Sequence, residues 1–353
     1  MPGSFRYRRR PTAEAAAALI IFVVALGLAT LFFTGRSDDG PVSGDTPGAW
    51  TVQDGGTAND LLDVSFPDAT NGWAVGEAGT ILHTSDGGAT WTLQDSGTKF
   101  ELAEVVFVDA DSGWAVGKFG TILHTSDGGR TWEHQADSFI TLDRSLIAVS
   151  FVDELTGWAF TQRGSFFLAT RDGGKTWSRE FLSNTSNRSG VYFVDSDRGW
   201  VSQSQGGVLR TTDGGESWTL ERGVTGPRIG TTQVFFLNEE LGWISGWRSK
   251  GQDFEFALLL SDGMIARTTD GGRSWERHDT GTGRFVWDVE FVSESEGWAV
   301  GSFGTVIYSD DGGISWTRQP SPVDTLLRSV TFADKKNGWA VGNDGTILKF
   351  TRP

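Results

Sequence analysis

Cysteine is absent from the 353-residue chain, which excludes disulfide bonds, thiolate metal sites and a lipid-modified N-terminal cysteine. The four histidines, His83, His124, His134 and His278, form no HxH or HxxxH pair, so we expect no zinc site. Methionine is scarce, with two residues, whereas glycine (48) and tryptophan (16) are abundant. This composition favours short strands and tight turns over helices. We expect an all-β fold with no metal and no cofactor.

A single long apolar run lies near the N-terminus. Residues 15–33 carry no charge, and a helix of this length would span about 28 Å, close to the hydrocarbon thickness of a bilayer. The arginines of MPGSFRYRRR favour a cytoplasmic N-terminus. A cleaved signal peptide is the alternative, but its apolar region is usually shorter, and no A-x-A site follows Phe33. We predict a basic cytoplasmic tail (1–14), a single transmembrane helix as anchor (15–34), a flexible linker (35–48) and an extracytoplasmic domain (49–353), which is periplasmic, luminal or extracellular.

The domain beyond the apolar run is strongly acidic. Residues 37–353 hold 25 Lys and Arg against 44 Asp and Glu, a net charge of −19. Such a domain repels nucleic acid, so we expect no DNA or RNA partner.

Gly-Trp pairs divide this domain into seven units. Their tryptophans are spaced by 41, 44, 42, 43, 55 and 41 residues, and a phenylalanine stands six residues before each glycine. Within one unit, residues 102–109, 113–119, 120–126 and 131–134 indicate four short strands separated by turn residues. Four strands repeated seven times predict a seven-bladed β-propeller. The tryptophans of the pairs are Trp73, Trp114, Trp158, Trp200, Trp243, Trp298 and Trp339.

The last unit lacks a fourth strand, and the missing strand is found at the front of the domain. AWTVQDGGT (49–57) matches TWTLQDSGT (90–98), which makes Trp50 the fourth-strand tryptophan of the seventh blade. We predict that this N-terminal strand closes the ring and leaves no open edge.

An Asp-Gly-Gly sequence precedes the fourth strand in six units and resembles the Asp-box of bacterial-neuraminidase-type propellers. An Asp in such a turn accepts hydrogen bonds from its own loop, and the glycines allow positive φ. Six symmetric copies cannot all form one active site, so we assign them a structural role. They are Asp86, Asp127, Asp172, Asp213, Asp270 and Asp311.

The pattern F-x-D-x-x-x-G-W-A-V-G-x-x-G-T-I-L-H-T-S-D-G-G-x-T-W, clearest at 66–91 and 107–132, resembles the photosystem II stability/assembly factor family. This resemblance covers residues 49–353 and implies a non-enzymatic assembly factor, a scaffold that holds a newly inserted subunit of a membrane complex and binds no small-molecule substrate. Cyanobacterial members are typically anchored by lipid on a cysteine. This chain has no cysteine, so its membrane attachment is expected to come from the N-terminal helix.

Two other functions remain open on the sequence. One is an extracytoplasmic adhesion or sensor propeller. The other is a sialidase-like glycoside hydrolase, which requires a tyrosine nucleophile, three arginines and an acid/base aspartate. Tyr192 and Tyr308 fall in predicted strands rather than loops, which disfavours the hydrolase.

Arginine is concentrated in the middle of the domain. Residues 144–228 contain nine arginines and one lysine against nine acidic residues. Arginine suits carboxylate recognition and protein interfaces, and the family resemblance implies an arginine-rich client surface. Blade-edge ion pairs are the simpler explanation of the same residues. On the face opposite the Asp-boxes we expect the candidate partner-binding residues Arg144, Arg163, Arg188, Arg228 and Arg248. Arg163 is predicted in the turn between the second and third strands of the third blade, Arg144, Arg188 and Arg228 in open blade-to-blade links, and Arg248 at the start of the insertion in the fifth blade.

The membrane anchor gives a first testable prediction. Protease added to right-side-out vesicles or spheroplasts should digest exposed loops of the propeller, because residues 15–34 hold it on the outer side of the membrane. Complete protection would contradict this orientation. Recovery of a soluble protein with a new N-terminus after Phe33 would show a cleaved signal peptide instead.

Overall fold

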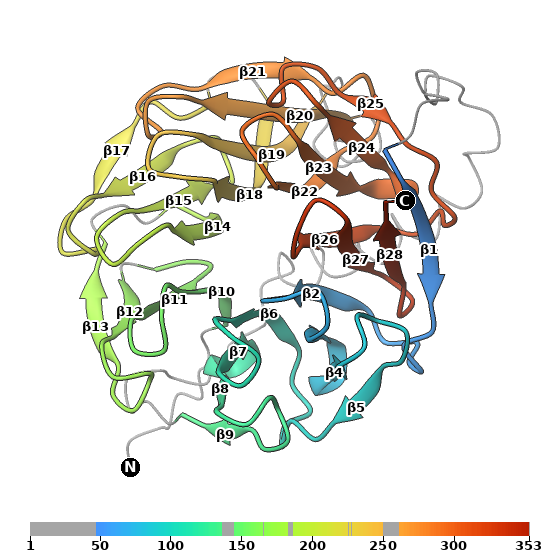
Figure 1. Ribbon diagram of the computed structural model, residues 1–353. Coiled ribbons are helices and arrows are strands. Elements are labelled where there is room, and N and C mark those ends of the chain that lie inside the picture. The colour runs from blue at the N-terminus through green and yellow to red at the C-terminus, as the bar shows by residue number, and fades with distance from the viewer. Residues whose placement is uncertain are drawn as a thin grey trace, which may run out of the picture.

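Seven antiparallel four-stranded sheets stand around a ring in the computed structural model, which describes residues 47–135, 145–164, 166–182, 186–224, 226, 228–249 and 261–352. The inner strands surround the centre and the fourth strands form the circumference (Figure 1). The seven-bladed propeller is therefore confirmed. The predicted transmembrane segment, 15–34, lies outside the described residues, and within them no helix is long and apolar enough to cross a membrane.

The strands follow the repeat, blade by blade. The inner strands are β2 (Leu61–Ser65), β6 (Leu102–Phe107), β10 (Leu146–Phe151), β14 (Arg188–Phe193), β18 (Ile229–Phe236), β22 (Val286–Phe291) and β26 (Leu327–Phe332). The second strands are β3 (Gly72–Gly76), β7 (Gly113–Gly117), β11 (Gly157–Thr161), β15 (Gly199–Gln203), β19 (Gly242–Ser249), β23 (Gly297–Gly301) and β27 (Asn337–Gly342).

The third strands are β4 (Ile81–Thr84), β8 (Ile122–Thr125), β12 (Phe166–Thr170), β16 (Val208–Thr211), β20 (Ser261–Thr268), β24 (Val306–Ser309) and β28 (Ile347–Thr351). The outer strands are β5 (Thr92–Gln94), β9 (Glu133–His134), β13 (Ser178–Phe181), β17 (Thr219–Glu221), β21 (Glu276–Asp279), β25 (Thr317–Arg318) and β1 (Ala49–Gln53). Short 3-10 turns, η1 (Glu77–Gly79), η2 (Lys118–Gly120) and η4 (Ser302–Gly304), join the second and third strands of three blades.

The repeated phenylalanine, glycine and tryptophan form one contact across each blade boundary. A Cβ on the glycine before each tryptophan would come within 2.1 to 2.6 Å of the phenylalanine ring of its own blade, so only glycine leaves room for that ring. The ring stacks on the tryptophan of the preceding blade, as Phe107 does on Trp73 with centroids 3.5 Å apart. Five further boundaries repeat this stack at 3.5 to 3.6 Å.

The same tryptophan is also tied to the next blade by a hydrogen bond. Trp73 Nε1 donates to the carbonyl of Gly128, in the Asp-box of the second blade, at 3.2 Å. Trp114, Trp158, Trp200, Trp243 and Trp339 do the same toward Gly173, Gly214, Gly271, Gly312 and Gly87, at 2.8 to 3.2 Å. The indole N–H is thereby satisfied at a fully buried position.

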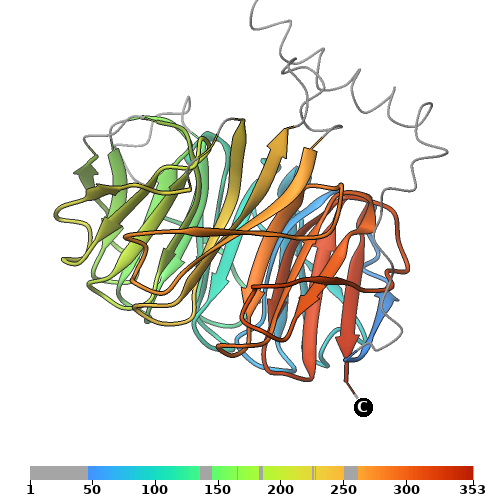
Figure 2. The same ribbon diagram turned by 90° about the horizontal axis from the view of Figure 1, so that it is seen from above.

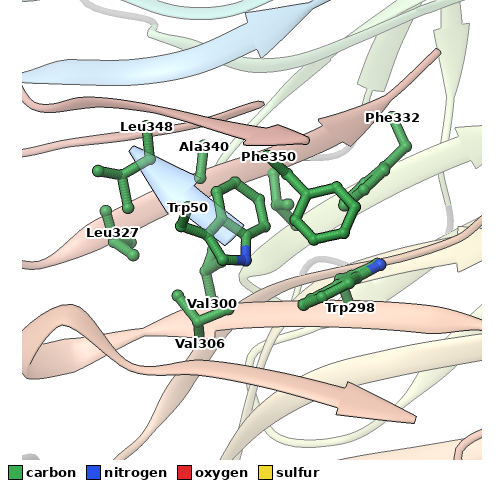
Figure 3. Packing of buried hydrophobic residues seen from close by; sticks show 10 residues of the cluster. Trp50, Trp298, Val300, Val306, Leu327, Phe332, Ala340, Leu348 and Phe350 are labelled. Carbon is green, nitrogen blue, oxygen red and sulfur yellow. The ribbon is translucent and has the colours of Figure 1, made fainter. Parts of the chain in front are cut away.

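The ring closes as the sequence predicts, with β1 paired antiparallel to β28 in the sheet β1-β28-β27-β26. Trp50 is 7% exposed and lies 5.6 Å from Trp298 and 5.4 Å from Phe350, ring centroid to ring centroid. Figure 3 shows these three rings in one cluster. At this boundary Trp298 and Phe332 are 5.6 Å apart, wider than the other stacks.

Closure gives the second prediction. Trp50→Ala should lower the free energy of unfolding by about 3–5 kcal/mol, because it empties a buried aromatic cluster. Trp316→Ala is the matched control within the repeat, since Trp316 is 8% exposed and should cost a similar amount. Deleting residues 1–45 should preserve a cooperative transition in urea, whereas deleting 1–57 should abolish it. Equal stability of the two fragments would disprove closure by β1.

Candidate partner-binding site

The propeller has two faces that carry different loops. Figure 2 shows the ring from the side, with one face at the top and the other at the bottom. One face carries the Asp-boxes and the turns between first and second strands. The Asp-box of a blade contacts the turn of the same blade, as Gly87 N does by donating a hydrogen bond to Thr70 O. We call it the Asp-box face. The other carries the turns between second and third strands and the blade-to-blade links, such as Glu77 N bonded to Asp60 O. We call it the loop face.

The Asp-boxes hold their own turns together. Asp86 Oδ1 accepts from Thr90 N at 2.9 Å and from Thr84 Oγ1 at 2.8 Å, and Thr90 Oγ1 donates to Oδ2 at 2.7 Å. Hydrogen bonds from the backbone and hydroxyl of Thr90 lower the pKa of Asp86 to about 2. The same set recurs at Asp127, Asp172, Asp213, Asp270 and Asp311. These contacts support the structural role predicted for the six residues.

Arg188 does not stand in an open link, as its sequence position suggested. It is the first residue of β14 and is 1% exposed. Its guanidinium donates to Thr161 O and Gly164 O, both at 2.6 Å, and burial lowers its pKa to about 10. Because its side chain is enclosed, Arg188 is a support for the turn at 161–164 rather than a residue that reaches a partner.

Arg163 lies in the turn that Arg188 supports. Its side chain is exposed, and its carbonyl accepts a hydrogen bond from Thr161 Oγ1 at 3.0 Å. The two arginines thus form one unit in which the buried side chain fixes the loop that displays the exposed one.

Arg228 and Arg248 are brought together on the fifth blade. Arg228 precedes β18 and has a φ of 61°, and its carbonyl accepts from Ser249 N at 3.0 Å. Arg248 pairs with Ile229 across the β18–β19 hairpin. Both arginines are exposed on the loop face. Arg144, the remaining candidate, lies outside the described residues.

A cavity of about 250 Å³ occupies the centre of the ring. Four carboxylates on the inner strands line it, and each accepts a hydrogen bond from the inner strand of the next blade. Asp63, Glu104, Asp288 and Glu290 bind the N–H groups of Val105, Val149, Val330 and Phe332, at 2.8, 2.8, 2.9 and 3.2 Å.

Burial in this cavity disfavours the ionised carboxylates. It raises the pKa of Asp63 to about 6, of Asp288 to about 7 and of Glu290 to about 8. The pKa of Glu104 also rises, through burial and then through the charge of Asp63. The sequence offered one signal for this group, since each carboxylate stands between apolar residues of an inner strand, with Asp288 and Glu290 both on β22.

The two tyrosines that bear on a hydrolase occupy different places. Tyr192 lines the central cavity, where burial and then Glu290 raise its pKa, which opposes the phenolate form needed for nucleophilic attack. Tyr308 donates to Glu296 Oε1 at 3.2 Å beside the ring closure. Within the described ranges no arginine lines the cavity, and no group of three or more His, Asp and Glu is placed to hold a metal.

Comparison with known proteins identifies the repeat. A family model described as the photosynthesis system II assembly factor YCF48 matches residues 44–139, 92–187, 134–220 and 280–351, more than half of the chain. The photosystem II assembly lipoprotein Ycf48 of Synechococcus sp. (strain CC9902) is 26% identical over 207 residues, which are 57% of this chain and 46% of that protein. The chain thus spans about half the length of this curated relative.

Solved structures confirm the architecture. YCF48 bound to D1 peptide has a TM-score of 0.71 at 22% identity, covering 91% of this chain and 100% of that one. YCF48 from Cyanidioschyzon merolae has a TM-score of 0.70 at 24% identity, covering 86% and 99%. A virginiamycin B lyase from Staphylococcus aureus also reaches 0.71, at 14% identity over 86% of this chain and 100% of the lyase. At such identities the likeness shows the fold alone.

The half-buried carboxylates of the central cavity predict a pH dependence of stability. Their pKa values are raised on folding from an ordinary value of about 4, so the stabilisation they provide is present at low pH and is lost as pH rises through about 6 to 8. The pKa values of the Asp-box carboxylates are lowered, so these groups act oppositely and lose their stabilisation as pH falls, at Asp86 through about 2. Melting temperature should therefore decline from about pH 5 to about pH 9. Glu290→Gln should flatten the decline, whereas Glu294→Gln, on an exposed residue, should not. A flat wild-type profile would contradict the raised pKa values.

Proposed function

Because the chain belongs to the photosynthesis system II assembly factor YCF48 family, we propose that it is a non-enzymatic assembly or stability factor that holds a membrane-protein client. The client is photosystem II or a related membrane complex. A structure of YCF48 bound to D1 peptide supports a peptide segment of a membrane subunit as the bound element.

The observation that carries the proposal is the exposure of Arg163, Arg228 and Arg248 on the loop face. The repeat uses the opposite face for its Asp-boxes, so the loop face is where sequence can vary without loss of the fold. In a domain of net charge −19, exposed guanidinium groups give a local site for carboxylates of the client. Each charge-assisted hydrogen bond contributes about 1.5–3 kcal/mol when it is desolvated, and much less at an exposed rim.

The proposal includes a place in the cell. The curated relative is a lipoprotein, whereas this chain has no cysteine to carry a lipid. An uncleaved helix at 15–34 would serve the same end and keep the propeller beside the membrane on its outer side. The linker at 35–48 would then allow the domain to reach a client in the same bilayer.

Charge reversal on the loop face tests the proposal. Arg163→Glu, Arg228→Glu and Arg248→Glu together should abolish co-purification of the client from native membranes, because they replace attraction by repulsion. The melting temperature should hardly change, since these side chains are exposed. Arg188→Glu should instead lower the melting temperature strongly, because it buries a carboxylate against two carbonyl groups.

A matched control lies on the other face. Arg130, Lys175 and Arg273 each follow the Asp-Gly-Gly of an Asp-box and are exposed, so their combined change to Glu alters the net charge equally and should leave the client bound. Retention of the client by the loop-face variant would refute the arginine surface. Absence of any membrane subunit from the wild-type preparation would favour an adhesion or sensor module, and turnover of a fluorogenic glycoside would favour a hydrolase.

A further inference from the structure

We propose that Trp287 and Arg328, at the loop-face rim of the central cavity, form the anchor that selects the client segment. They would receive a large apolar side chain that lies next to a carboxylate. This inference rests on the proposed function and assigns its specificity to named residues. Trp287 is the second residue of β22 and Arg328 the second residue of β26, so they are neighbours on the rim, above the cavity that later residues of both strands line.

Trp287 serves no contact of the repeat. Fourteen of the 16 tryptophans belong to the Gly-Trp pairs or the fourth strands, which leaves Trp247 and Trp287. The Gly-Trp residues are at most 1% exposed, whereas Trp287 is half-buried. The other inner strands carry smaller side chains or arginine at the equivalent position: Leu62, Ala103, Ile147, Ser189, Thr232 and Arg328. A partly exposed tryptophan that no blade boundary requires is typical of an interface anchor.

The pair is held in place before any partner arrives. The guanidinium carbon of Arg328 lies 5.2 Å from the ring centroid of Trp287, and the Phe285 ring lies 5.9 Å from the same tryptophan, centroid to centroid. Arg328 Nε donates to Asn343 Oδ1 at 2.8 Å, while its Nη2 is 3.9 Å from the Asp60 carboxylate. Fixed side chains lose little entropy on binding, which favours them as recognition elements.

Arg328 keeps hydrogen-bonding capacity for a partner. A guanidinium has five N–H donors, and among the residues that the structure describes only Asn343 accepts a hydrogen bond from Arg328. An arginine stacked on an aromatic ring can still bind a carboxylate through its edge. The stacked pair therefore offers an apolar surface and a carboxylate site side by side.

A second aromatic–arginine contact lies on the sixth blade, which also carries Trp287. Phe303 has a φ of 54°, a strained conformation for a bulky residue, and the guanidinium carbon of Arg284 lies 5.4 Å from its ring centroid. The equivalent turn residue of the second blade is also a phenylalanine, Phe119, with a φ of 57°, whereas the first and seventh blades carry Ala78 and Asp344. The repeat therefore does not require an aromatic residue at this turn, and the sixth blade has one on the blade that carries Trp287.

The occupant that fits is a protein segment rather than a bilayer. Glu77, Asp324 and Asp344 are exposed on the loop face of the first and seventh blades, and they would repel a flat anionic membrane. An extended segment can follow the arginines of the third, fifth and sixth blades to the rim, where it meets Arg328 beside the Asp60 carboxylate, 3.9 Å from Nη2. Charge therefore favours an acidic peptide with a large apolar residue.

The test uses the full chain in nanodiscs of neutral lipid and a phage library of random 12-residue peptides. Peptides enriched on the wild-type chain should combine Asp or Glu with an adjacent aromatic or large aliphatic residue. Synthetic copies should bind Trp287→Leu and Arg328→Gln at least tenfold more weakly. Trp287→Leu introduces the side chain found at Leu62, so the blade should fold. Arg130→Gln, on the Asp-box face, is the control and should bind as the wild type does.

Several results would overturn the inference. One is that no peptides are enriched, or that the enriched peptides lack an acidic residue next to a large apolar one. Another is that both rim variants bind the peptides as tightly as the wild type does. A third is that the wild type prefers anionic vesicles and Trp287→Leu removes this preference. If a rim variant melts lower than wild type, Trp287→Phe and Arg328→Lys replace it, and undiminished peptide binding by both would again count against the anchor.

Native-membrane purification separates the two proposals. Rim variants that retain the client, while the loop-face charge reversal releases it, would refute the anchor alone. A wild-type chain that recovers no client would refute the proposed function.

Discussion

A phenylalanine ring confined between a glycine and a tryptophan sets the spacing of the blades. The glycine of the same blade leaves room for the ring on one side, and the tryptophan of the preceding blade stacks on it at 3.5 to 3.6 Å. The tryptophan in turn donates to a glycine carbonyl of the next Asp-box, as Trp73 does to Gly128. The Asp-box is therefore the acceptor end of an inter-blade contact. Chemistry placed on that loop would disturb the packing, which favours the loop face for the proposed binding of a client.

The seventh boundary departs from this rule because two ends of the chain meet there. Trp50 enters from β1, and Trp298 and Phe332 are 5.6 Å apart instead of tightly stacked. Polar contacts secure the joint, since Arg352 donates to Pro47 O at 3.0 Å and to the carboxylate of Glu296. Because β1 begins opposite the C-terminal end of β28, the chain enters the propeller at the Asp-box face.

Sequence analysis correctly predicted the features that depend on a residue type repeated at the same position of each blade. The repeat gave the number of blades, and the match of Trp50 to Trp91 gave the closure. It failed for Arg188, which was assigned to an open link. When the inner strands are aligned on their phenylalanines, Arg188 occupies the position of Leu61 and Leu102, both fully buried, so a signal was present. The spacing of residues along the chain does not show that the carbonyl groups of Thr161 and Gly164 point toward that position. The cavity carboxylates were missed for the same reason, because their partners are backbone N–H groups of the next blade.

The distribution of charge supports the proposal that this acidic propeller binds an acidic segment. Four carboxylates face the central cavity, where burial raises the pKa of Asp288 and Glu290 to about 7 and 8, so near neutral pH they carry less than their full negative charge. Exposed arginines stand on the loop face, and Arg188 fixes the turn that displays Arg163. A rigid ring that holds guanidinium groups in place loses less entropy on binding than mobile lysines would. Affinity of this kind depends on a few oriented groups rather than on net charge, and it falls with salt, which is consistent with the proposed role as an assembly or stability factor.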